Sequence, residues 1–221
     1  MSLVAMVPDS NIHVVDNFCN SYPVSIERVK KLIGIQHSSR IQMTRLDLRD
    51  KKDVFNLFAS QRFDAVIHFA GLKAVGESVA NPLTYYSNNM RATIVLLEAM
   101  VEFGVKNIIF SSSCTVYGNP QHVPIAESHP GQPSSPYGRT KRNIEIMLED
   151  IAKSDPSWRI ASLRYFNPVG CHPSGEIGEH PPGVPQNLMP YIERVALEKL
   201  PKVSFMSPTL VFLYQQLLIP N

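Results

Sequence analysis

Short runs of β-branched and other apolar residues alternate along this chain with longer segments whose apolar residues recur at helical spacing. Such an alternation is typical of parallel strands joined by crossover helices, so it predicts an α/β fold with a doubly wound parallel sheet. We expect strands at 12–15, 41–46, 65–69, 107–111 and 160–165. We expect helices at 23–33, 50–60, 83–104 and 137–153.

Two of the expected strands contain nearly continuous apolar runs, at 65–69 and 108–110. This composition suits inner strands that are covered on both faces, and ligands of such sheets bind at the carboxyl ends of the strands. Glycine and proline then become frequent over 171–190, before a short helical stretch at 191–199. We expect the segment 171–190 to form a loop over the binding site.

The charge and the cysteines limit the classes of partner. With 21 basic and 19 acidic residues and no long run of one sign, the chain gives no electrostatic reason to expect nucleic acid or an anionic membrane. The three cysteines have neither metal-ligand nor disulfide-framework spacing, which is typical of a reducing compartment and predicts a cytoplasmic protein. Residues 1–10 lack a basic leader and 209–219 are too few to span a bilayer, so neither predicts export or anchoring.

A tyrosine and a lysine, Tyr137 and Lys141, stand four residues apart at the start of an expected helix. Both side chains then project from one helix face toward a common ligand. We expect the lysine charge to lower the pKa of the phenol, which would make Tyr137 a usable general base. The alternative for this pair alone is an aromatic ring that packs under the aliphatic part of a lysine.

Three serines, Ser111, Ser112 and Ser113, follow the apolar run 108–110 and are expected at the carboxyl end of that strand. A hydroxyl there could share a hydrogen bond with Tyr137 and a substrate hydroxyl. Serines after a strand are otherwise an ordinary turn. The order of strand, serines, proline-rich loop and helix with Tyr137 and Lys141 is more specific than either half, and it favours an enzyme site.

This constellation resembles the short-chain dehydrogenase/reductase superfamily, in which serine, tyrosine and lysine act on a nicotinamide cofactor. Within it, four strings are similar to the UDP-glucose 4-epimerase family, and the resemblance runs from about residue 11 to 200. The strings are HFAGLKAVGES at 68–78, FSSSCTVYG at 110–118, LRYFNPVG at 163–170 and QNLMPY at 186–191. The rival resemblance, to nucleotide-sugar dehydratases, requires an Asp-Glu pair where this chain has Cys114 and Thr115, which cannot act as carboxyl acids.

The epimerase resemblance implies a Rossmann-like fold and a reaction that interconverts UDP-glucose and UDP-galactose, or their N-acetyl forms, through a 4-keto sugar with bound NAD. It implies that Tyr137 takes the proton of the 4-hydroxyl group and that Ser113 orients this hydroxyl. Lys141 then holds the nicotinamide ribose and lowers the pKa of Tyr137.

The same resemblance implies the remaining contacts of NAD and of the UDP-sugar. Asp16 corresponds to the acid that accepts hydrogen bonds from the adenosine ribose. The other implied cofactor contacts are Asn17, Asn20, Ser21, Asp47, Leu48, Phe69, Ala70, Gly71, Leu72, Lys73, Asn89, Ser111, Ser112, Tyr137, Lys141, Tyr165 and Phe166. The implied substrate contacts are Lys73, Ser113, Thr115, Tyr137, Asn167, Asn187 and Leu188. His68 is interpreted as a satisfied core residue, and no metal site is expected.

The family pattern is interrupted at both ends of the chain. No glycine-rich turn precedes Asp16, so we expect the first strand of the sheet and its phosphate-binding turn to be missing. Residues 1–7 align with the end of the first family helix, although a short strand is equally compatible. We therefore expect an incomplete NAD-binding domain at 1–167 and a remnant of the substrate domain with a divergent tail at 168–221.

The interrupted pattern leaves an alternative to an active enzyme. The chain could be a non-catalytic remnant that pairs through the helices at 83–104 and 137–153. The resemblance implies that these two helices form the bundle of a homodimer, so a homodimer is the expected assembly.

Overall fold

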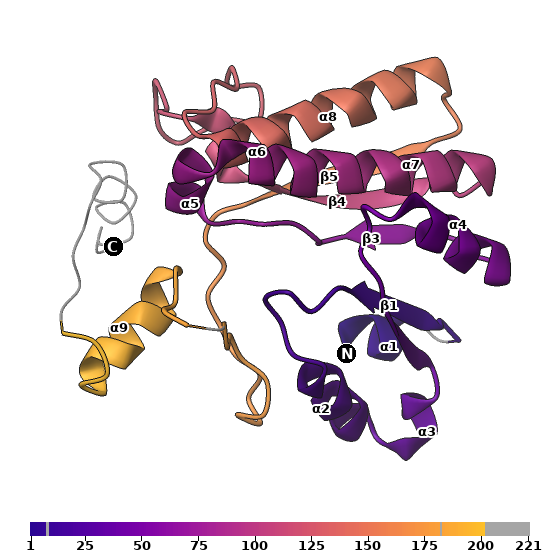
Figure 1. The fold of residues 1–221 in the computed structure, drawn as a ribbon, viewed down its shortest axis with the longest axis horizontal. Coiled ribbons are helices and arrows are strands. Elements are labelled where there is room, and N and C mark those ends of the chain that lie inside the picture. Colours follow the sequence, from indigo (N-terminus) through magenta and orange to yellow (C-terminus); the bar gives the residue numbers. More distant parts are fainter. Residues whose placement is uncertain (8, 182, 202–221) are drawn as a thin grey trace.

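A computed structural model describes residues 1–7, 9–181 and 183–201, and its elements have the expected α/β order (Figure 1). The strands are β1 (Ile12–Asp16), β2 (Ile41–Arg45), β3 (Val66–His68), β4 (Asn107–Ser113) and β5 (Arg159–Tyr165). The α-helices are α1 (Ser2–Met6), α2 (Val24–Ile33), α3 (Ile35–Ser38), α4 (Lys51–Ser60), α5 (Val75–Ala80), α6 (Pro82–Tyr85), α7 (Ala92–Glu102), α8 (Pro136–Ser154) and α9 (Leu188–Ala196). Residues 1–7 thus contain a helix, not a strand, and the apolar segment 209–219 lies outside the described residues.

All paired strands run parallel, as the sequence predicted, but the described strands form two sheets. One sheet has the order β1-β2, with Asp16 opposite Arg45 at its carboxyl end. The other has the order β3-β4-β5, with Ser113 opposite Tyr165. Figure 1 shows the small β1-β2 sheet below the edge strand β3 of the larger sheet.

Helices α5 to α8 lie along one face of the larger sheet (Figure 1). Helix α7 is apolar on most of its surface, and Ala99 and Met100 are fully buried in the core that it forms with Ile108 and Phe110 of β4. On the opposite face, Ile67, Ile109 and Leu163 are 38%, 39% and 43% exposed. The expectation of strands covered on both faces therefore fails for the described residues, because the helices gather on one side only.

The expected helix at 83–104 is divided by a π-helical segment, Tyr86–Arg91. Asn89 lies inside this segment and is 3% exposed. An inserted π turn rotates the following residues relative to a regular helix, and such insertions are frequent at functional sites. Residue spacing alone could not reveal it, because the sequence remains apolar at helical intervals on both sides.

Strand β4 is longer than expected and ends at Ser113 rather than at Ser111. Ser111, Ser112 and Ser113 pair with Leu163, Arg164 and Tyr165 of β5. The serines are thus the last residues of a strand, not a turn after it. Successive side chains of a strand point to opposite faces, so Ser112 faces the helices with Phe110, whereas Ser111 and Ser113 face the other way.

His68 is a satisfied core residue, as the sequence indicated. Its ring is 3% exposed, and its Nε2 atom is 2.9 Å from the hydroxyl of Thr93. Burial, and to a smaller extent the charge of Lys141, lowers the pKa of His68 to about 3.

This low pKa predicts a specific loss of stability in acid. The folded pKa lies below the unfolded one, so the contribution is complete above about pH 6.5 and disappears as the pH falls toward 3. We expect the loss to be on the order of 4 kcal/mol, because each pKa unit corresponds to about 1.4 kcal/mol. In urea unfolding between pH 3 and 7, the free energy of unfolding of His68→Gln should depend less on pH than that of the unmodified chain. His122→Gln changes an exposed histidine and is the control, whose pH dependence should equal that of the unmodified chain.

Candidate functional site

The first turn of α8 holds Tyr137 beside the carboxyl end of β4. Ser135 caps the helix, since its hydroxyl accepts a hydrogen bond of 3.1 Å from the backbone N–H of Gly138, and Pro136 occupies the first helical position. Tyr137 is 8% exposed, and its phenol lies near enough to the Ser113 side chain for that hydroxyl to lower the phenol pKa as a hydrogen-bonding neighbour. The cap and the proline therefore start the helix at the residue that brings the phenol to the strand end.

Gly138 allows α8 to approach the short 3₁₀ helix Cys114–Tyr117 closely. A Cβ atom at this position would lie 2.8 Å from the backbone oxygen of Thr115. Thr115 also donates from its backbone N–H and its hydroxyl to the Ser113 hydroxyl, at 3.2 and 3.0 Å. Ser113 is thus held from one side by Thr115 and from the other by Tyr137.

Lys141 is buried one turn further along α8, with 5% of its surface exposed. Its ammonium donates to the backbone oxygen of Ser111 at 2.7 Å and lies 5.9 Å from the centre of the Tyr137 ring. Burial lowers the pKa of Lys141 to about 8. Tyr137 and Lys141 therefore lie together against the end of β4, as the sequence predicted for the pair.

The expected effect of this lysine on the phenol is wrong for the described structure. The pKa of Tyr137 is raised, first of all because burial disfavours the phenolate, although the hydrogen bond with Ser113 acts in the opposite direction. The ammonium lies over the ring and bonds to a carbonyl of β4, so its charge is not directed at the phenol oxygen. A further positive charge or a hydrogen-bond donor at the hydroxyl is needed to bring this pKa toward neutrality.

The loop after β3 is fixed by the π-helical segment. The amide of Asn89 accepts a hydrogen bond from the Leu72 N–H at 2.8 Å and donates to the Leu72 carbonyl at 2.9 Å. It also donates to the hydroxyl of Thr140, in α8, at 3.2 Å. Gly71 packs against the same amide, since a Cβ atom there would lie 3.2 Å from its oxygen. Asn89 thus joins the loop of residues 69–73 to the helix that carries Tyr137.

Two acids lie at the carboxyl ends of the smaller sheet. Asp16 accepts hydrogen bonds from the Phe18 N–H at 2.7 Å and from the Ser21 hydroxyl at 2.9 Å. The carboxylate of Asp47 is bonded by Arg49 and by Asn17, and the side-chain hydrogen bond of Arg49 is the largest reason why the pKa of Asp47 lies far below its usual range. The predicted residues therefore form two hydrogen-bonded pairs, Asp16 with Ser21 and Asn17 with Asp47, at the same end of the sheet.

The remaining predicted residues lie around the ends of β3 and β5 and in the later loop. Phe69 and Phe166 are 63% and 50% exposed, and Phe69 stacks toward Tyr165 with 6.5 Å between the ring centres. Lys73 and Asn187 both contact the carboxylate of Glu179, at 3.5 and 2.7 Å. The positions not yet described are Asn20, which is exposed, Leu48, which packs on the core, Ala70, Asn167, with a positive φ of 41°, and Leu188, the first residue of α9.

Sequence reasoning missed Glu179 and Glu145 as partners of the expected site. Glu179 bonds to Lys73 and Asn187, which are far apart in the sequence, so no local pattern could identify it. Glu145 did carry a signal, because it follows Lys141 by four residues and so lies on the helix face that bears the site.

The residues present fit a dinucleotide in kind. Asp16 supplies an acceptor for ribose hydroxyls, Lys141 an ammonium with three N–H donors, and Phe69 and Phe166 exposed apolar rings. Residues 1–15 contain no glycine, so a glycine-rich phosphate-binding turn is not part of the sequence before Asp16. Among the described residues there is no cluster of metal-ligating side chains, and none of their helices has the length and apolar character that crossing a membrane requires.

Comparisons with known proteins agree with this chemistry. The model of the NAD dependent epimerase/dehydratase family matches residues 4–211. UDP-glucose 4-epimerase 2 of Arabidopsis thaliana is 54% identical over 86% of this chain and 54% of its own length. A bifunctional UDP-glucose and UDP-xylose 4-epimerase of Pisum sativum is 51% identical over 88% of this chain and 55% of its own length.

A solved structure supports the same relationship. The UDP-glucose 4-epimerase of Bifidobacterium longum, crystallised with NAD+ and UDP, has a TM-score of 0.83 and 47% identity, covering 90% of this chain and 60% of that protein. This chain therefore spans about half the length of the curated relatives that it matches. From the match of the family model over most of the sequence, we conclude that the chain belongs to the NAD dependent epimerase/dehydratase family.

Proposed function

We propose that this chain carries the catalytic half of a UDP-glucose 4-epimerase, which interconverts UDP-glucose and UDP-galactose by oxidation and re-reduction at C4 with bound NAD. The observation that carries the proposal is the contact of Tyr137 with Ser113 above a buried Lys141. The curated relatives named above, which act on UDP-glucose, support it. NAD, when bound, supplies the hydride acceptor and donor.

Tyr137 is the proposed base for the sugar 4-hydroxyl proton. Its contact with Ser113 supports this role, because a hydrogen bond to the phenol oxygen favours the phenolate. Ser113 then orients the sugar hydroxyl, and Thr115, which bonds to Ser113, lies at the same place. Lys141 is proposed to hold the nicotinamide ribose with its buried ammonium.

The proposed NAD contacts form two groups. Asp16, Asn17, Ser21 and Asp47 form the adenosine side, with the neighbouring Asn20 and Leu48. The nicotinamide side is proposed to comprise 69–73, Asn89, Ser111, Ser112, Tyr165 and Phe166, and its support is the bonding of Asn89 to both the loop and α8.

The UDP-sugar is proposed to bind between the loop of residues 69–73 and the beginning of α9. Lys73 and Asn187 both bond to the carboxylate of Glu179. The two side chains can therefore reach one anionic group, which supports the proposal that they bind the same substrate. Asn167 and Leu188 complete the proposed substrate contacts. The proposed division is an NAD-binding part at 1–167 and the beginning of the substrate part at 168–221.

A second candidate is a non-catalytic fragment. It is favoured by the division of the strands into two sheets, together with the exposed apolar residues Ile67 and Ile109. The exposed residues lie on the face of the larger sheet that the described helices leave uncovered. The separation into two sheets supports the proposal that a strand belongs between β1 and β3, and that the glycine-rich phosphate turn belongs with it. Loss of several charge-assisted hydrogen bonds of about 1.5–3 kcal/mol each would then weaken NAD binding by many powers of ten.

The assembly proposed for either candidate is a cytoplasmic homodimer formed through α7 and α8. Ile94 and Val101 of α7 are 41% and 62% exposed, and Ile146 of α8 is 40% exposed. Exposed apolar residues on neighbouring helices are the kind of surface that a helix bundle buries.

Bound NAD and turnover decide between the two candidates. We expect the purified chain to carry NAD, measured by absorbance and fluorescence after release, and to convert UDP-galactose to UDP-glucose in an assay coupled to UDP-glucose oxidation. The controls are protein stripped of cofactor and a reaction without sugar. Absence of both NAD and turnover, with NAD added in excess, would refute the enzymatic proposal and leave the fragment.

A further inference from the structure

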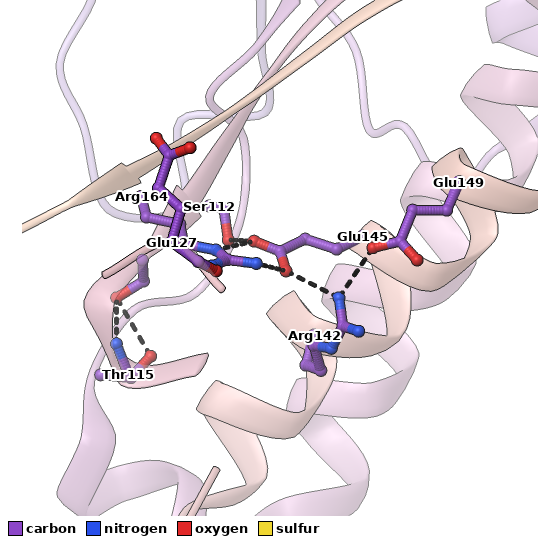
Figure 2. Close-up of polar contacts among 8 residues, drawn as sticks. Ser112, Thr115, Glu127, Arg142, Glu145, Glu149 and Arg164 are labelled. Carbon is purple, nitrogen blue, oxygen red and sulfur yellow. Dashed lines mark hydrogen bonds and ion pairs between the residues drawn. The ribbon is translucent and has the colours of Figure 1, made fainter. Parts of the chain in front are cut away.

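The buried carboxylate of Glu145 is the centre of a polar network that joins α8 to both β4 and β5 (Figure 2). Glu145 is 2% exposed. It accepts a hydrogen bond of 2.6 Å from the Ser112 hydroxyl and two of 2.9 Å from the guanidinium of Arg164. Arg142 adds a contact of 3.1 Å from one helical turn away. Both oxygens of a carboxylate inside the protein are therefore fully engaged.

Three successive turns of α8 lie against the three last residues of β4, and two of them are hydrogen-bonded to it. Lys141 donates to the Ser111 carbonyl and Glu145 accepts from the Ser112 hydroxyl, while the Tyr137 phenol lies beside the Ser113 side chain, which lowers its pKa. The helical residues are spaced by four, so they lie on one face of α8. The helix and the strand end thus meet at three points, and the third is Glu145.

Arg164 extends the network to the loop that leads into α8. It donates from Nη1 to the backbone oxygen of Glu127 at 3.0 Å, and its guanidinium lies 4.8 Å from the centre of the Tyr117 ring. Figure 2 shows the guanidinium of Arg164 between Glu145 and Glu127. Glu145, through Arg164, therefore fixes the loop before Tyr137 as well as the helix after it.

We propose that Glu145 is a positioning residue that sets the hydroxyl of Tyr137 against Ser113. Removing a carboxylate from water is costly unless its partners are all in place, and these partners belong to β4, β5 and α8. Only one placement of α8 along β4 satisfies them together. The catalytic meaning of this role rests on the proposed function, whereas the positioning itself is a property of the folded chain.

A double-mutant cycle on the pKa of Tyr137 tests the proposal without turnover. The protein is labelled with tyrosine carrying ¹³C at Cζ, and the Tyr137 resonance is assigned by its absence in Tyr137→Phe. In the unmodified chain, Ser113→Ala should raise the pKa of Tyr137 by about one unit, because a hydrogen bond that favours phenolate is lost. In the Glu145→Gln background, the same Ser113→Ala change should shift the pKa by less than about a third of that.

Glu149→Gln is the matched control. It removes a carboxylate from the same helix and from the same Arg142, but Glu149 is half exposed. In the Glu149→Gln background, Ser113→Ala should therefore raise the pKa of Tyr137 as much as it does in the unmodified chain. If Glu145→Gln does not fold, Ser112→Ala, which removes a single hydrogen bond to Glu145, replaces it in the same cycle.

Two results would overturn the positioning role. One is a full Ser113→Ala shift in Glu145→Gln protein, which would leave Glu145 a stabilising residue only. The other is no shift in the unmodified chain, which would mean that Ser113 does not hold the phenol. A chain without NAD or turnover refutes the proposed function but leaves this cycle measurable, so the two failures are distinguishable.

Discussion

Tyr137→Phe is expected to lower epimerase turnover by a factor of about 10² to 10⁴ while NAD binding is retained. The substitution removes the phenol oxygen, whose pKa the neighbouring Ser113 hydroxyl lowers, and leaves the buried ring in place. Because burial raises the pKa of this phenol, the unmodified enzyme should become faster with rising pH above neutrality, and the variant should lose that rise. The coupled assay between pH 6 and 9, with bound NAD determined separately, measures both effects.

Tyr85→Phe is the control for the loss of a phenol oxygen near the site. The Tyr85 ring lies 6.5 Å from the Tyr137 ring, but its hydroxyl donates to Glu77 at 2.8 Å and accepts from the Ala74 N–H at 3.0 Å. We expect this variant to lose stability by about 1–3 kcal/mol, because two partly buried hydrogen bonds disappear, and to keep its turnover. Comparable turnover in Tyr137→Phe and unmodified protein would disprove the assignment of the base.

The sequence predicted the strands and most helices because their hydrophobic period is local. The parallel order and the pairing of Tyr137 with Lys141 follow from the same local patterns, since four residues of helix always bring two side chains to one face. The π-helical segment at Asn89 was not predictable in this way, because it depends on the contacts of Asn89 with Leu72 and Thr140.

Electrostatics also escaped prediction from the sequence. The spacing of Lys141 and Tyr137 suggested a lowered phenol pKa, but the depth at which both are buried decides the direction. Burial depends on how α8 sits on β4, and that placement involves Glu145 and Arg164, which come from different elements. The spacing of residues in the sequence therefore identifies the groups of a site, but their protonation states depend on burial, which only the structure gives.

The loop before α8 can close only because residue 118 is a glycine. Gly118 has a positive φ of 66° and forms a bridge with Gln132. A Cβ atom at Gly118 would lie 1.8 Å from the backbone oxygen of Gln132, so the two backbone segments have to separate if a side chain is present. Three residues after Gln132, Ser135 caps α8, and Tyr137 follows in its first turn.

Gly118→Ala is therefore expected to lower the free energy of unfolding by about 3–5 kcal/mol, by the strain of a positive-φ conformation (φ 66°, ψ −135°) that side chains rarely adopt and by the displacement of Gln132. Gly104→Ala separates the two causes, because Gly104 has a φ of 71° but no described atom lies within 4 Å of the place that its Cβ would take. Gly104→Ala should lower the free energy of unfolding by only about 1–2 kcal/mol. Urea unfolding of both variants measures the difference, and equal losses would show that the approach of Gln132 to Gly118 does not hold the entrance of α8.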